Sequence, residues 1–161
     1  MAKKIIGVFG GGNVSETMSE YQAAFDIGRG IAKHGCILLT GGLGGVMTAA
    51  SKGAREEGGT TIGILPGSRD TSPPNPYVDI AIYTGMGEAR NVINVKSCNS
   101  AIAVGGEYGT LSEIALALKT GCPVVLLDSW SFARHAAAAE SMLTAATPDE
   151  AVTMAIAAAG Y

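Results

Sequence analysis

Charged residues are scarce in this chain of 161 residues, at 16% against roughly 25% in an average domain. No stretch of about 18 apolar residues occurs, so no transmembrane helix is expected. The net charge of −3 at pH 7 argues against broad, charge-driven binding to nucleic acid or to an anionic membrane. A small protein with so few charges often buries surface between subunits, and we therefore expect a homodimer or homotetramer.

Cysteine and histidine are also rare, with three and two residues. The cysteines are odd in number and form no C-x-x-C pair, so neither a disulfide framework nor a structural zinc site is expected. Reduced thiols in the cytoplasm are the simpler interpretation. His34 and His135 have no partner four residues away, which predicts no metal site. The apolar run 5–9 is too short for the core of a signal peptide, so we expect a cytoplasmic protein.

Short apolar runs alternate with longer segments of helical periodicity along the whole chain. This alternation predicts an α/β fold, in which residues 1–161 form one Rossmann-like nucleotide-binding domain. We expect a parallel sheet of about six or seven strands with helices on both faces. The expected strands are 5–9, 36–40, 60–65, 80–83, 101–104 and 124–127. The expected helices are 19–34, 46–57, 87–98, 110–119 and a last one that begins after Thr147.

Two segments are harder to assign. Residues 66–78 contain four prolines and form the one long loop, which we interpret as a flap over a site. The alanine-rich residues 133–146 are compatible with a helix, a loop or a short last strand. Neither segment changes the expected fold class.

Glycine is abundant, at 23 residues, which is about twice its usual share. Three glycine-rich turns, 10–12, 41–45 and 105–109, each follow an expected strand and precede a helix. Such turns lie at the carboxyl edge of a parallel sheet, where unpaired helix amides can bind a phosphate. Alternatively, each turn only connects its strand tightly to its helix, but three converging turns favour an anion site. The candidate phosphate- or nucleotide-binding residues are Gly11, Gly12, Gly41, Gly42, Gly44, Gly45, Gly106, Glu107, Tyr108, Gly109 and Thr110.

The usual nucleotide-binding signatures are absent. The sequence has no G-x-x-x-x-G-K-[ST], which excludes a P-loop NTPase. The first strand is not followed by a full G-x-G-x-x-G, and the second ends in Thr40 where a dinucleotide site has an acid. A mononucleotide or a similar phosphorylated small molecule therefore fits better than NAD.

Residues 88–113 carry the most specific pattern. Arg90 is followed by the stretch 105–113, Gly-Gly-Glu-Tyr-Gly-Thr-Leu-Ser-Glu. This pattern resembles the Lonely Guy superfamily of nucleoside 5′-monophosphate phosphoribohydrolases, whose signature is P-G-G-x-G-T-x-x-E with an arginine upstream. The likeness spans roughly residues 4–127. Here Gly105 replaces the proline and Glu107 replaces the second glycine, which makes the chain more similar to the molybdenum-cofactor carrier proteins than to the hydrolases.

The resemblance implies two alternative functions. One is a binding or carrier protein for a phosphorylated nucleotide or a molybdopterin-type cofactor. The other is a phosphoribohydrolase that releases a free base and ribose 5-phosphate. In both, the partner is a small phosphorylated ligand, a nucleoside monophosphate or the molybdenum cofactor, and no further cofactor is required. A structural oligomer without a ligand is a third hypothesis.

The resemblance assigns Arg90 and Glu113 to the catalytic positions if the protein is an enzyme. Glu113 would stabilise positive charge at the ribose carbon and help to activate water. Its alternative role is structural, because residues 110–113 read Thr-Leu-Ser-Glu and match a capping box. Arg90 would clamp a phosphate or orient the glutamate, unless it is an ordinary surface arginine.

Overall fold

The computed structural model describes residues 2–132 and 142–160. Its strands are β1 Ile5–Gly10, β2 Ile37–Thr40, β3 Thr61–Leu65, β4 Ile80–Tyr83, β5 Ser100–Val104, β6 Val124–Leu127 and β7 Met142–Ala145. Its helices are α1 Ser19–Lys33, α2 Val46–Glu56, the 3₁₀ helix η1 Gly87–Arg90, α3 Asn91–Lys96, α4 Tyr108–Thr120 and α5 Pro148–Ala158.

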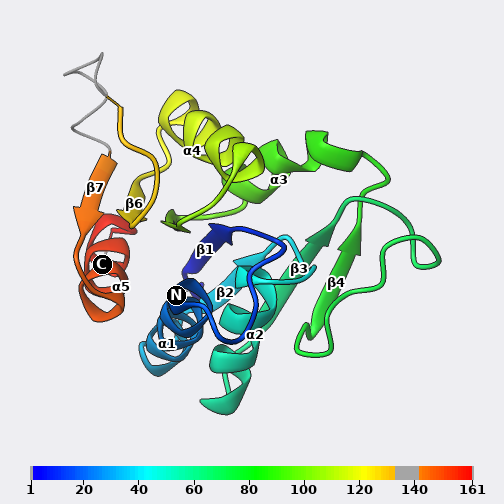
Figure 1. The fold of residues 1–161 in the computed structure, drawn as a ribbon, viewed down its shortest axis with the longest axis horizontal. Coiled ribbons are helices and arrows are strands. Elements are labelled where there is room, and N and C mark those ends of the chain that lie inside the picture. Colours follow the sequence, from blue (N-terminus) through cyan, green and yellow to red (C-terminus); the bar gives the residue numbers. More distant parts are fainter. Residues whose placement is uncertain (1, 133–141, 161) are drawn as a thin grey trace.

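The strands form one parallel sheet in the order β4-β3-β2-β1-β5-β6-β7 (Figure 1). Helices α1, α2 and α5 cover one face, and α3 and α4 cover the other (Figure 1). Strands buried on both faces should be continuously apolar, and β5 and β6 are buried at every residue. The predicted α/β fold is therefore confirmed.

Helices α1 and α2 pack backbone to backbone. A Cβ on Gly28 of α1 would lie 2.0 Å from the carbonyl oxygen of Ala50, and one on Gly53 of α2 would lie 2.0 Å from that of Phe25. Only glycine permits this approach, which packs α2 closely against α1.

Two predicted helix boundaries are wrong. The segment 87–98 is not one helix but η1 followed by α3. Helix α4 begins at Tyr108, with Glu107 as its N-cap, so Thr110 lies inside the first turn and the predicted capping box does not form. The reason is the turn before α4, in which Gly105 and Gly106 have φ values of 52° and 96° and turn the chain into the helix early.

The last helix begins as predicted, since the Thr147 hydroxyl accepts a hydrogen bond from the Glu150 amide at 3.2 Å. Of the ambiguous segment 133–146, residues 142–145 form the edge strand β7, and residues 133–141 lie outside the described residues. Within the described part of the chain, no helix has the length and apolarity needed to cross a bilayer.

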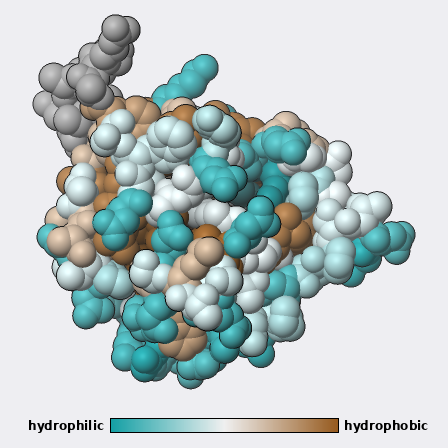
Figure 2. Space-filling model, in the orientation of Figure 1, coloured by the Kyte–Doolittle hydropathy of each residue, from teal (hydrophilic) through white to brown (hydrophobic). Residues whose placement is uncertain are grey.

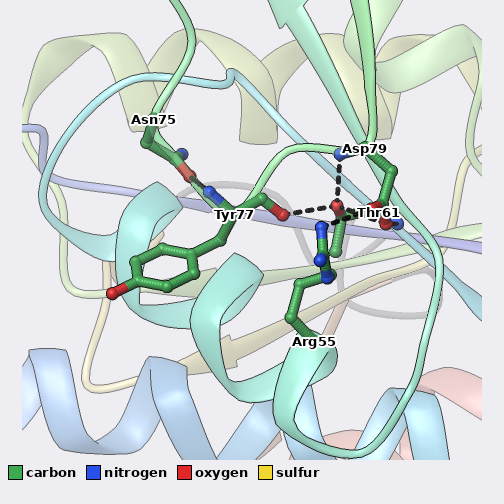
Figure 3. Close-up of polar contacts among 5 residues, drawn as sticks. All are labelled: Arg55, Thr61, Asn75, Tyr77 and Asp79. Atoms are coloured by element: carbon green, nitrogen blue, oxygen red, sulfur yellow. Dashed lines mark hydrogen bonds and ion pairs between the residues drawn. The ribbon is translucent and has the colours of Figure 1, made fainter.

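The proline-rich loop 66–78 is tied down at its second half. The Asn75 backbone amide donates to the Gly42 carbonyl oxygen, and the Asn75 side-chain amide donates to that of Leu43, both at 2.9 Å. Further along, the Asp79 carboxylate accepts from the Thr61 amide at 2.9 Å and pairs with Arg55 at 2.5 Å (Figure 3). The second half of the loop is therefore held against the turn after β2.

One part of the sheet is less well covered. Ile80 and Ile82 on the edge strand β4 are 47% and 44% exposed. They pair with Ile62 and Ile64, and Ile64 belongs to the core beneath α3 and α4, so both exposed side chains lie on that face. On the side of the molecule drawn in Figure 2, hydrophobic residues form only small, separate patches between hydrophilic ones.

Candidate ligand-binding site

A cavity of about 300 Å³ lies at the carboxyl ends of the central strands. It is bounded by the turns after β1 and β2, by η1 and by the first turns of α4. Eight predicted residues line it: Gly11, Gly12, Gly41, Arg90, Glu107, Gly109, Thr110 and Glu113. The topology thus brings together residues more than a hundred positions apart in the sequence.

Five predicted residues lie outside this cavity: Gly42, Gly44, Gly45, Gly106 and Tyr108. Three of them form the turn after β2, where the chain packs against itself. The Tyr108 side chain is 81% exposed, and its ring centroid is 6.0 Å from that of Trp130. Gly106 borders a separate surface hollow with Gly105, Asp128 and Trp130.

Glu113 is buried at the base of the cavity, with 8% of its surface exposed. Its Oε1 accepts a hydrogen bond from the Asn94 side-chain amide at 2.9 Å. Burial raises the pKa of Glu113 to about 7, and the bond from Asn94 and the positive charge of Arg90 oppose this rise. Glu113 therefore changes its charge near neutral pH, a property typical of functional sites.

Arg90 points inward and binds backbone carbonyls. Its Nη1 donates to the carbonyl oxygen of Gly41 at 2.5 Å and also to that of Ile64. It thereby joins the ends of β2 and β3. A Cβ on Gly41 would lie 2.6 Å from Nη1, so the guanidinium fits only beside a glycine. Burial lowers the pKa of Arg90, against the attraction of Glu113 and Glu88.

The first turn of α4 presents open backbone amides. Glu107 makes no side-chain capping bond, and the amides of Tyr108, Gly109 and Thr110 have no acceptor within residues 2–132 and 142–160. The first amides of a helix carry partial positive charge and favour an anion. Gly109 and Thr110 line the cavity, so this charge lies at the cavity wall.

Sequence reasoning missed two groups of residues. The apolar wall of the cavity consists of Phe9, Leu43, Met47 and Pro66. Asn94 does not line the cavity but is fully buried and holds Glu113. A signal for Asn94 existed, because it is a polar residue within the apolar run 92–95. Asn91 also lines the cavity, and its side-chain amide donates to the Ser112 hydroxyl at 2.8 Å.

The charged lining groups are mostly acidic. Three glutamates, Glu88, Glu107 and Glu113, line the cavity, and Arg90 is the single cation among the lining residues that the structure describes. No group of three or more histidine, cysteine or acidic side chains suited to a metal ion occurs in the described ranges. Among the groups that the described lining offers a ligand are backbone amides, one arginine and a titratable carboxyl.

The fold is Rossmann-like, and the cavity lies at the strand ends, where open parallel sheets bind their ligands. The SLOG cluster4 family model matches residues 3–155, and the chain belongs to that family. An uncharacterised protein of Archaeoglobus fulgidus is 46% identical over 151 residues, which cover 94% of this chain and 93% of that protein.

Two solved structures are also similar. The molybdenum cofactor binding protein of Rippkaea orientalis is 42% identical, with a TM-score of 0.88, and 98% of each chain is covered. The molybdenum cofactor carrier protein of Chlamydomonas reinhardtii is 42% identical, with a TM-score of 0.85, over 99% of this chain and 100% of that one. The resemblance carried by residues 88–113 is thereby confirmed.

Proposed function

We propose that the protein is a binding or carrier protein for the molybdenum cofactor or a closely related phosphorylated pterin. The observation that carries this proposal is the set of uncapped amides at the start of α4, which face a cavity shared with Arg90. The names of the two similar structures, which bind or carry the molybdenum cofactor, supply the ligand class.

The residues present fit such a ligand. The amides of Gly109 and Thr110 would hold the phosphate, and Arg90 lines the same cavity. The apolar side chains of Phe9, Leu43 and Met47 offer a wall for a flat ring system. Any molybdenum would arrive as part of the cargo.

A binding experiment tests the proposal. A cofactor at 100 times its Kd adds about 2.7 kcal/mol of stability, which raises Tm by roughly 5–10 °C in a domain of this size. Gly109→Val, which places a branched side chain on the lining, should weaken binding at least tenfold. Ala115→Val changes an exposed residue of the same helix and is the matched control. An unchanged Tm with the molybdenum cofactor would contradict the proposal.

A second candidate function is hydrolysis of a nucleoside 5′-monophosphate. It is favoured by one observation, the presence of both Arg90 and Glu113 on the cavity. The test is chromatographic detection of free base released from AMP. Release that disappears in Glu113→Gln would support an enzyme, and tight binding without release would exclude one.

We also propose that the protein is a cytoplasmic homodimer or homotetramer that binds neither nucleic acid nor membrane. The exposed Ile80 and Ile82 on β4 support an interface, because parallel strands are normally covered on both faces. Sedimentation velocity should find at least a dimer for the wild type and a smaller species for the double variant Ile80→Glu, Ile82→Glu. A wild-type monomer would contradict this part of the proposal.

A further inference from the structure

The acidic lining of the cavity admits an anionic ligand under one condition. Glu88, Glu107 and Glu113 outnumber Arg90, and Arg90 already donates Nη1 to two backbone carbonyls. If all three glutamates were ionised, a phosphate would enter a site with an excess of negative charge. Binding an anion there is easier if one carboxyl is neutral.

Glu113 is the carboxyl that can become neutral. Glu88 and Glu107 are exposed and face water, whereas Glu113 is 8% exposed. The charged groups near Glu113 are Arg90 and Glu88, of which Glu88 interacts with Arg90. The thiol of Cys98, which follows α3 in the chain, also lies close enough to Glu113 to interact with it. Because Glu113 is buried among few charges, its pKa is raised to about 7, and it exchanges a proton with solvent near neutral pH.

Asn94 decides which oxygen of Glu113 carries that proton. The Asn94 amide donates to Oε1 at 2.9 Å, so Oε1 serves as the acceptor and Oε2 is the oxygen left for the cavity. Asn94 is fully buried, and the Cys98 thiol donates to its backbone carbonyl at 3.1 Å, so its position is fixed by packing.

We propose that Glu113 enters the ligand complex as a neutral carboxylic acid that donates a hydrogen bond from Oε2 to an anionic oxygen of the ligand, with Asn94 as its positioning residue. This inference rests on the proposed function and adds to it that ligand and proton are bound together. The proton comes from solvent when the ligand enters, and it returns to solvent when the ligand leaves.

Glutamine at position 113 should imitate the neutral acid. Its Oε1 can accept from Asn94 as Glu113 does, which directs its Nε2 amide into the cavity as a donor. Leucine has a similar size but donates nothing. If Glu113 were instead a carboxylate that accepts a hydrogen bond from the ligand, Glu113→Gln should bind more weakly than the wild type. Its Nε2 amide would then present a donor where the ligand needs an acceptor.

Calorimetric titration with the molybdenum cofactor, between pH 6 and 8.5 and in buffers of different ionisation enthalpy, tests the inference. At pH 8 the wild type should take up close to one proton more per cofactor than Glu113→Gln, and its Kd should rise up to tenfold per pH unit above 7. Comparison with Glu113→Gln removes the titration of the phosphate itself. At pH 8 Glu113→Gln should bind up to about tenfold more tightly than the wild type, and Glu113→Leu should bind more weakly than Glu113→Gln.

Asn94→Leu tests the positioning role of Asn94 through the pH dependence of proton uptake, which a merely structural role would not change. The hydrogen bond from Asn94 favours the charged form of Glu113. Without this donor, the pH range in which cofactor binding takes up a proton should therefore lie higher than in the wild type. Glu56→Gln, at an exposed position outside the cavity, is the matched control and should leave the profile unchanged.

The outcomes separate the two proposals. Cofactor binding by the wild type with no more proton uptake than in Glu113→Gln overturns the inference alone, and so does a tenfold loss of affinity in Glu113→Gln at pH 8. Absence of cofactor binding by the wild type at every pH overturns the proposed function, and this inference with it. If Asn94→Leu does not fold, the comparison of Glu113→Gln with Glu113→Leu still decides the question.

Discussion

The glycine turns after β2 and β5 look alike in sequence but differ in what their helices do with their first amides. In the turn after β2, the Val46 amide donates to the Gly11 carbonyl oxygen at 3.0 Å and the Met47 amide to that of Gly44 at 3.2 Å. The protein itself therefore satisfies the first two amides of α2. At the start of α4, the amides of residues 108–110 have no such partner in the described ranges.

The difference shows that a glycine-rich turn is not by itself a ligand cradle. Gly45 is glycine because its φ is 60° and its ψ −127°, and because a Cβ there would lie 2.1 Å from the Gly11 carbonyl oxygen. A Cβ on Gly109, by contrast, would have nothing within 4 Å, and this residue lines the cavity. The turn after β2 is filled by packed backbone, whereas the turn after β5 leaves open space beside the cavity.

The largest expected effect tests the packed turn. Gly45→Ala should cost about 4 kcal/mol, because it combines backbone strain with a clash against backbone atoms that cannot yield. Urea unfolding measures the loss, and Gly12→Ala, whose Cβ would meet only the flexible Met47 at 3.7 Å, is the control. Equal stability of the two variants would break the distinction between the turns.

The second-largest expected effect on stability is that of Glu113→Gln, and it depends on pH. Because the pKa of Glu113 is about 7 when folded and 4.5 when unfolded, the folded state binds a proton more tightly. Its contribution to stability is complete below pH 4.5 and is lost as the pH rises through 7. Glu113→Gln should therefore resemble the wild type near pH 4.5 and exceed it by about 3 kcal/mol at pH 8. Unfolding curves at both pH values provide the measurement, and a constant difference would contradict the assignment.

Arg90 connects the turn after β2 to the end of β3, so its removal should have an intermediate effect on stability. Arg90→Met leaves the carbonyls of Gly41 and Ile64 without their donor and should cost about 2 kcal/mol. Arg55→Met breaks an exposed ion pair with Asp79 and should cost less than about 1 kcal/mol. Thermal unfolding of both variants checks this order, and the reverse order would show that Arg90 does not hold the strands.

The smallest stability effect is expected at the open turn. Gly109→Ala lies in the first turn of α4 with free space around it, so the free energy of unfolding should stay within about 1 kcal/mol of the wild type, because alanine is the better helix former and meets no clash. Its affinity for the molybdenum cofactor should nevertheless fall. A stability loss as large as that of Gly45→Ala would mean that both turns are packed alike.

Much of the site was predictable because its residues occur in a short, specific pattern. Arg90 and Glu113 were assigned through the family resemblance of residues 88–113, and both line the cavity. The contact between Asn94 and Glu113 was not predictable, because it depends on how α3 packs against α4. The role of Glu113 as a helix cap was wrong for a related reason, since the turn at residues 105–106 starts α4 two residues early.

The sequence alone determined the order of strands and helices, the parallel sheet and the edge at which its glycine turns gather, since these follow from hydrophobic periodicity and from local turn chemistry. Only the tertiary structure decided which of those turns is filled by the protein's own backbone and which stays open. It also decided that Glu113 is buried against Asn94. Both outcomes depend on contacts between segments distant in the chain, and such contacts leave no local pattern in the residues that make them.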